Sequence, residues 1–237
     1  MLSEREARLQ IIEVGQLLEK NGLVVATDGN ISIRLGNRVL ITPKGSQIGK
    51  LKTEELVVIN MDGDRLEGPK YPSSELLLHL EIYKYRADVK AVVHAHPPKC
   101  VAASIAGLKL TCPIIPEIVL YLGSVPTLSY GTPGTPEIFK DLEKYIDRCD
   151  VFNLERHGAV CIGKELQEAF YKLQKLEYFA GIYLEVAKIG HAKCLNKSEV
   201  AKLMEIRDKH NISHPILHPE EFCNCIDECE QVKKLNE

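Results

Sequence analysis

The sequence predicts a single α/β domain with three layers, in which a mixed, largely antiparallel sheet lies between helices. Two observations support this fold class. Segments with helical periodicity and short runs of strand-forming residues both occur along the chain, and they alternate only loosely. With 237 residues, 45% of them hydrophobic, the chain is long enough to bury one large core. We therefore expect one domain over residues 1–237, with 191–237 as a C-terminal helical extension.

The first helix is predicted from its cap and its period. Ser3 and Glu6 have the spacing of a capping box, and Gly22 is placed to end the helix. The apolar positions that follow the cap are Ala7, Ile11, Val14 and Leu18. Two strand-like runs, 31–34 and 39–42, come next and are joined by the turn residues Gly36 and Asn37.

The central part predicts a helix, a strand and another helix. Residues 71–74 open the helix, whose apolar face is expected to hold Leu76, Leu77, Leu80 and Tyr83. Residues 89–94 form an apolar run of strand length that Pro97 and Pro98 stop. A short helix over 99–106 follows. Residues 112–136 are rich in Pro and Gly, and we expect short extended pieces and loops there.

The last third predicts two strands and a long helix. The strands cover 151–154 and 159–162, with a polar break at 155–158. The helix runs from 164 to about 188. Its inward positions are predicted to be Leu166, Ala169, Phe170, Leu173, Leu176 and Ala180.

Composition excludes several functional classes. Thirty basic and 33 acidic residues give a net charge of -3. This balance argues against a protein that binds nucleic acids or membrane surfaces. The first ten residues are charged and resemble no export signal, so we expect a cytoplasmic protein whose eight cysteines are mostly reduced. In the tail, His214, His218, Cys223, Cys225 and Cys229 could bind a metal, although an ordinary helical tail is favoured.

His94 and His96 are the strongest candidates for chemistry. Side chains two residues apart in a strand point to the same face, so the two imidazoles project together where the strand ends. Such a pair is half of a zinc site, and two buried histidines bonded to the backbone are the alternative. His157, in the polar break before Gly158, would complete a three-histidine site with an open position, which is typical of catalytic zinc. Considered alone, the position of His157 favours an ordinary histidine in a loop.

Glu75 is the candidate acid–base residue. It follows Ser73 and Ser74 at a predicted helix start, where free N–H groups attract anions. An N-capping serine followed by a glutamate in the first helical turn is the ordinary alternative. The turns 27–30 and 42–45 each contain glycine, flank a short strand and could offer N–H groups to a phosphate.

Five motifs occur in order: TDGNIS at 27–32, ITPKG at 41–45, PSSE at 72–75, HAH at 94–96 and RHG at 156–158. This series resembles the class II aldolase and adducin family, and within it the fuculose-phosphate aldolase branch. The resemblance extends from about residue 5 to residue 190. It implies a single α/β domain, a lyase of carbohydrate metabolism, and a cyclic homotetramer with active sites near subunit boundaries.

The resemblance also assigns roles to residues. It implies that His94, His96 and His157 bind Zn²⁺, or another divalent ion such as Mn²⁺, and that Glu75 is the catalytic acid–base near that metal. It implies a phosphate site made of Gly29, Asn30, Lys44, Gly45, Ser73 and Ser74. Lys44 stands where the branch has threonine, and it could add a positive charge beside the phosphate.

The expected reaction is reversible cleavage of a ketose 1-phosphate, similar to L-fuculose 1-phosphate, into dihydroxyacetone phosphate and a small aldehyde. A Lewis-acid metal suits the enediolate that this cleavage leaves, and a carboxylate suits the proton transfer. A Schiff-base aldolase would need a buried lysine nucleophile, for which the sequence offers no clear candidate.

The sequence departs from the branch at one catalytic position. Where fuculose-phosphate aldolases have a tyrosine, Glu117 aligns, and Tyr121 or Tyr130 could substitute for it. A glutamate there resembles methylthioribulose-1-phosphate dehydratase, which lacks the Ser-Ser-Glu arrangement of 73–75, and a solvated loop carboxylate is equally consistent. The alternatives are therefore that dehydratase or a sugar-phosphate epimerase, and a non-catalytic module like the adducin head.

Overall fold

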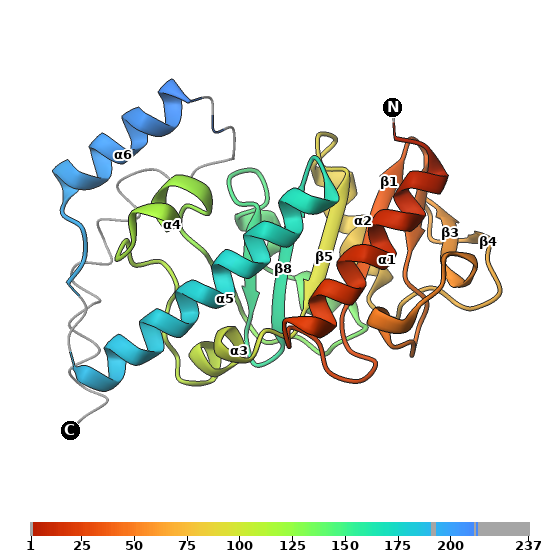
Figure 1. The fold of residues 1–237 in the computed structure, drawn as a ribbon, viewed down its shortest axis with the longest axis horizontal. Helices are drawn as coiled ribbons and strands as arrows, with labels where there is room; N and C mark the ends of the chain where they lie inside the picture. The colour runs from red at the N-terminus through yellow and green to blue at the C-terminus, as the bar shows by residue number, and fades with distance from the viewer. Residues whose placement is uncertain (1, 191–192, 211, 213–237) are drawn as a thin grey trace.

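A computed structural model describes residues 2–190, 193–210 and 212. The described helices are α1 (Glu4–Lys20), α2 (Leu76–Tyr85), α3 (Pro98–Ile105), α4 (Pro116–Tyr121), α5 (Leu166–Ile189) and α6 (Lys197–Lys209). The strands are β1 (Asn30–Leu35), β2 (Arg38–Ile41), β3 (Val57–Asn60), β4 (Arg65–Glu67), β5 (Ala91–Ala95), β6 (Thr127–Leu128), β7 (Val151–Leu154) and β8 (Gly158–Gly163). Figure 1 shows the helices packed around one sheet.

All eight strands form one mixed sheet in the order β4-β3-β2-β1-β5-β8-β7-β6. Every pairing is antiparallel except β6 with β7. The two central strands, β1 and β5, pair Asn30 with His94 and Ser32 with Val92. The predicted fold class is confirmed, and the pairing of β1 with β5 joins two of the sequence motifs.

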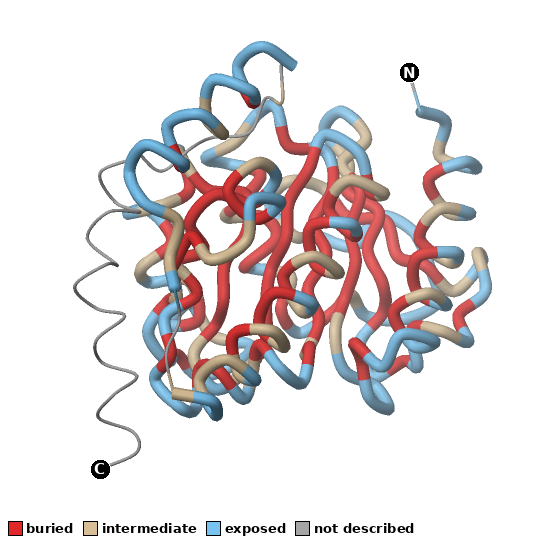
Figure 2. Tube along the Cα trace, turned by 60° about the vertical axis from the view of Figure 1, so that its left-hand side comes forward, coloured by how far each residue is buried: buried red, intermediate tan, exposed pale blue. Residues whose placement is uncertain are grey.

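Helices cover both faces of the sheet, and each face has its own hydrophobic core. One core packs α1, α3 and α5 against residues such as Val93 and Ala95. The other packs α2 against residues such as Val92 and Val160. Because side chains alternate along β5, His94 lies on the α2 side. In Figure 2 the middle of the sheet is buried, as expected for a sheet between two layers, whereas the edge strand β4 is exposed.

Most of the expected elements are confirmed. Helix α1 begins with the Ser3–Glu6 capping box, and Gly22 follows it with φ of 66°. All six inward positions predicted for α5 are buried. The expected apolar face of α2 was wrong at Leu77, which is 44% exposed. The strands β3 and β4 and helix α6 were not predicted individually.

The region 112–136 is not only extended pieces and loops, as expected, because it contains helix α4. Pro116 occupies the first helical turn, where a missing N–H costs nothing. Ile118 and Val119 are buried, and Val119 packs with Val200 of α6. Glu117 therefore lies in the first turn of a helix rather than in a loop.

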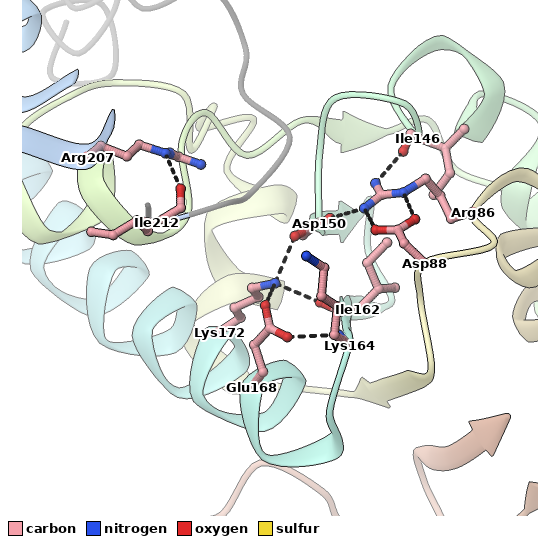
Figure 3. Close-up of polar contacts among 10 residues, drawn as sticks. All are labelled: Arg86, Asp88, Ile146, Asp150, Ile162, Lys164, Glu168, Lys172, Arg207 and Ile212. Atoms are coloured by element: carbon pink, nitrogen blue, oxygen red, sulfur yellow. Dashed lines mark hydrogen bonds and ion pairs between the residues drawn. The ribbon is translucent and has the colours of Figure 1, made fainter. Parts of the chain in front are cut away.

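A buried group of ion pairs ties α5 to the sheet (Figure 3). The Lys172 ammonium group lies 2.8 Å from both Asp150 and Glu168, and it donates to the carbonyl oxygen of Ile162. Arg86, which follows α2, reaches Asp150 at 3.1 Å and also pairs with Asp88. Asp150 therefore links the layers on the two sides of the sheet.

No helix in the described part of the chain combines the length and apolar character needed to cross a lipid bilayer. Of the described cysteines, Cys100, Cys112, Cys149 and Cys161 are buried and Cys194 is partly exposed. The candidate tail residues His214, His218, Cys223, Cys225 and Cys229 lie outside the described residues.

Candidate metal centre

His94 and His96 lie at the end of β5, as the sequence predicts. The His94 ring is completely buried, and its Nδ1 donates to the carbonyl oxygen of Ala159 at 3.0 Å. That hydrogen bond leaves Nε2 as the atom with a free lone pair. Nε2 of His94 lies 3.1 Å from Nε2 of His96. Two lone-pair nitrogens this close suit a shared metal ion better than a bond to each other.

His157 joins them from the turn between β7 and β8. Its ring stacks on that of His94, with centroids 4.9 Å apart. The turn requires Gly158, because a Cβ there would lie 2.3 Å from the carbonyl oxygen of Ala95. Arg156 precedes His157 with φ of 58°, a conformation rarely adopted by residues other than glycine. This tight turn is what brings the third imidazole to the end of β5.

The three histidines fit a divalent metal. One potential ligand atom from each ring lies within 4.8 Å of the others. Three imidazoles with a free fourth position are the donor set of catalytic zinc sites. Burial and the neighbouring histidines lower the pKa of His96 to about 4, which keeps this ring neutral and able to ligate in the metal-free protein.

Asp28 contacts one of the three histidines, His96. Its carboxylate lies 3.3 Å from Nδ1 of His96. A carboxylate that accepts from one ring nitrogen leaves the other nitrogen as the metal ligand and makes it more basic. No separate role was predicted for Asp28 from the sequence, although carboxylates commonly accompany ligating histidines.

Glu75 points into the histidine cluster. It is the N-cap residue of α2 and its side chain makes no capping bond, so the alternative of an N-capping serine followed by a first-turn glutamate does not hold. One carboxylate oxygen lies 2.9 Å from Nε2 of His157 and the other 3.1 Å from Nε2 of His94. Burial raises the pKa of Glu75, but these two histidines outweigh burial and hold it well below its usual value. Glu75 is therefore an ionised carboxylate at the metal centre.

The predicted phosphate-binding residues come from three segments that the fold places side by side. Ser73 N donates to Thr42 O, and Lys44 N donates to Tyr71 O, so the ITPKG and PSSE motifs run alongside each other. Thr42 Oγ1 also accepts from the amide of Ile31, which follows Gly29 and Asn30. Lys44, Gly45 and Ser74 are exposed and Ser73 is buried. Their role in phosphate binding stays a prediction.

Asn30 has close partners that the sequence did not predict. Its Nδ2 donates to Glu75 at 2.7 Å, and its Oδ1 contacts Nε2 of His79. His79 and Tyr83 lie one and two helical turns after Glu75 in α2. This four-residue spacing of polar side chains on a buried helix face was the sequence feature that could have indicated them.

Glu117 is exposed on α4, and none of the described contacts of the histidine cluster involves it. Tyr121, on the same helix, packs against Lys175 of α5, with the ammonium group 4.5 Å from the ring centroid. Tyr130 lies against Arg156, the neighbour of His157, at 6.0 Å. Of the three side chains considered for the missing tyrosine, only Tyr130 contacts a segment of the metal centre.

Comparisons with known proteins identify the family of the chain. Residues 9–184 match the model of the class II aldolase and adducin N-terminal domain. A 5-deoxy-D-ribulose 1-phosphate aldolase of Bacillus thuringiensis is 35% identical over 207 residues, which are 86% of this chain and 95% of that protein. A 3-oxo-tetronate 4-phosphate decarboxylase of Haemophilus influenzae is 34% identical over 73% of this chain and 84% of its own length.

A solved L-fuculose 1-phosphate aldolase has the same fold. It superposes with a TM-score of 0.80 and 27% identity over 89% of this chain and 98% of that one. The family match covers well over half of the chain. Four of the five sequence motifs contribute residues to the contacts of the histidine cluster. The chain therefore belongs to the class II aldolase and adducin family.

Proposed function

We propose that this protein is a divalent-metal-dependent aldolase, with zinc as the metal, that cleaves a ketose 1-phosphate into dihydroxyacetone phosphate and a small aldehyde. One observation carries the proposal. Three histidine nitrogens and one ionised carboxylate, from three segments of the chain, meet at the end of β5. His94, His96 and His157 would hold the ion, with Glu75 beside it.

The bound ion would act as a Lewis acid for the carbonyl and adjacent hydroxyl oxygens of the substrate. The protein supplies the proton transfer. In the condensing direction, the Glu75 carboxylate would remove a proton from the hydroxymethyl carbon of dihydroxyacetone phosphate. The resulting enediolate attacks the aldehyde carbonyl, and an acid at the far end of the site protonates the new alkoxide. Because Glu75 is ionised, it is ready to act as this base.

Phosphate recognition would place the reacting carbons. Ser73 and Ser74 directly precede Glu75, so a phosphate held by their segment keeps the neighbouring carbons close to the carboxylate. Lys44 and Gly45 lie on the adjoining segment and can supply a positive charge and a backbone N–H group. Because the substrate is held in this position, the proton transfer becomes an effectively unimolecular step of the enzyme–substrate complex.

A panel assay tests this proposal. Purified protein loaded with zinc is given ketose 1-phosphates whose aldehyde halves are lactaldehyde, glycolaldehyde or a methylthio analogue. Release of dihydroxyacetone phosphate is measured with a coupled dehydrogenase. Release from at least one of these phosphates, and none from the unphosphorylated sugars, is expected. If no substrate is cleaved and dihydroxyacetone phosphate does not exchange its proton with solvent, the aldolase proposal is wrong.

The similarity to 3-oxo-tetronate 4-phosphate decarboxylases supports a second candidate. When such an acid loses carbon dioxide, the electrons of the broken bond pass toward the neighbouring carbonyl. This leaves the same enediolate of dihydroxyacetone phosphate, so the metal centre and Glu75 suit both reactions. The two reactions differ in the group that leaves. An aldehyde requires an acid–base partner at the far end of the site, whereas carbon dioxide does not. A 3-oxo-tetronate 4-phosphate is therefore added to the panel. Release of carbon dioxide from this acid, compared with release of aldehyde from the ketose 1-phosphates, separates the two candidates.

The remaining alternatives fit the site less well. A module like the adducin head has no use for an assembled three-histidine centre with an ionised glutamate. Epimerases of this family carry aspartate where this chain has Glu75. A dehydratase that uses Glu117 stays open, and the cytoplasmic location stays a prediction.

A further inference from the structure

A row of buried polar side chains lies between β1 and α2, directly behind Glu75. Asn30 and Ser32 are two residues apart and lie on the same face of β1. His79 and Tyr83 are one helical turn apart on α2. All four are at most 3% exposed. Buried polar groups are costly unless each has a partner, and together these four form one connected chain of hydrogen bonds.

The direction of this chain follows from its end at Glu75. Asn30 donates from its Nδ2 to a carboxylate oxygen of Glu75 at 2.7 Å, which fixes the orientation of its amide. The amide oxygen of Asn30 then faces Nε2 of His79 at 2.5 Å. An oxygen that accepts requires a donor, so Nε2 of His79 carries its proton.

The rest of the chain follows in the same way. A neutral His79 with its proton on Nε2 has a lone pair on Nδ1, and the Ser32 hydroxyl donates to it at 2.7 Å. The Ser32 oxygen in turn lies 2.8 Å from the Tyr83 hydroxyl. Burial lowers the pKa of His79 to about 3, so the ring is neutral at ordinary pH. Ser32, His79 and Asn30 therefore each donate to the next group toward Glu75.

We infer that His79 is a positioning residue, which fixes the Asn30 amide and through it the Glu75 carboxylate in the orientation that faces the metal centre. The inference rests on the proposed role of Glu75 as the base. Without a donor at position 79, the Asn30 amide can turn over and present its oxygen to the carboxylate. Two acceptors would then face each other, and Glu75 would rotate away.

The first test measures proton exchange rather than the full reaction. The zinc-loaded protein is incubated with dihydroxyacetone phosphate in deuterium oxide, and exchange at the hydroxymethyl carbon is followed by NMR. His79→Leu should slow the exchange roughly 10- to 100-fold, as the loss of a residue that orients the groups around a metal does. The affinity for dihydroxyacetone phosphate should be unchanged. His79→Gln keeps an amide donor and should recover most of the rate. Ile82→Val, a packing change in the same helix, should exchange like the original protein.

Two results would overturn the inference. One is normal exchange in His79→Leu. The other is weaker binding of dihydroxyacetone phosphate with an unchanged exchange rate at saturation, which would place Asn30 in phosphate binding instead. Rescue by glutamine distinguishes positioning from general support of the fold, because both variants replace the same buried ring.

A second test needs no activity. NMR of the metal-free protein labelled with ¹⁵N-histidine should show one neutral ring protonated at Nε2, which stays neutral down to about pH 5 and is lost in His79→Gln. A crystal structure of His79→Leu should lack the contact of Asn30 Nδ2 with Glu75. If the contact persists, or the ring carries its proton on Nδ1, the inference fails even if the enzyme is an aldolase. If the original protein exchanges no proton while both structural results hold, only the proposed function fails.

Discussion

His94 reaches the metal centre from the end of β5 and His157 from the turn between β7 and β8, so each ligand can be tested separately. Replacing either with alanine removes one of three nitrogen ligands. We expect His94→Ala and His157→Ala each to lose most of the bound zinc, because catalytic zinc is held by three protein ligands. Metal content of the purified variants, measured by mass spectrometry, checks this. Wild-type metal content in both variants would show that the ion binds elsewhere.

Asp28 offers a finer test of the same centre, because it touches His96 and not the metal. Asp28→Ala should weaken zinc binding roughly 10- to 100-fold, as other losses of a carboxylate behind a ligating histidine do. Asp28→Asn keeps an oxygen that accepts from Nδ1 and should weaken binding less. Competition with a coloured chelator measures both affinities.

Asp147→Asn serves as the control for net charge, since its side chain is 78% exposed and lies in another part of the chain. It should bind zinc like the original protein. Equal affinities in Asp28→Ala and Asp147→Asn would show that Asp28 does not orient His96.

Glu75 and Glu117 are predicted to divide the acid–base work. Glu75 lies at the metal centre, so Glu75→Gln should abolish proton exchange into dihydroxyacetone phosphate while zinc stays bound. Glu117 is exposed on α4 and is assigned to the aldehyde end. Glu117→Gln should therefore slow cleavage of the full substrate and leave the exchange intact. The opposite pattern in NMR exchange and cleavage assays would favour the dehydratase.

At the scale of elements, the ion pairs of Lys172 join α5 to the sheet. Lys172→Met removes the ammonium partner of the buried Asp150 and of the partly exposed Glu168. Removing one member of a buried pair costs about 3–5 kcal/mol of unfolding free energy. Because Arg86 still pairs with Asp150, we expect about 3 kcal/mol, the lower end of that range.

Lys188→Met is the matched control, because it removes a lysine from the same helix whose pair with Glu185 is exposed on both sides. Its loss should cost less than about 1 kcal/mol. Urea unfolding of both variants measures the difference. Similar costs for the two would mean that the Lys172 pairs add no stability beyond that of a surface pair.

At the scale of the whole molecule, the family resemblance predicts a homotetramer. Closed cyclic symmetry is a common arrangement of soluble oligomers. Light scattering at micromolar concentration should give about four times the 26.6 kDa mass of one chain. A mass of 26.6 kDa would refute the tetramer.

The sequence predicted those parts of the protein that local rules control. Helix α1 follows from its capping box and period, and α5 from a regular apolar face over 24 residues. His94 and His96 share a face because strands alternate. Helix α4 was not predicted, because its six residues are too few to show a helical period. Its packing against α6, which stabilises it, cannot be seen in the local sequence.

The sequence by itself determined the fold class, the ligand types and, through five ordered motifs, the family. Only the tertiary structure decided how those residues meet. Asn30 and Glu75 are 45 positions apart and His157 and Glu75 are 82 apart, and strand order places them in contact. The orientation of the Asn30 amide, the tautomer of His79 and the support of His96 by Asp28 depend on such contacts. Capping and periodicity act within a few residues, whereas a hydrogen-bond partner far along the chain is set only when the sheet assembles.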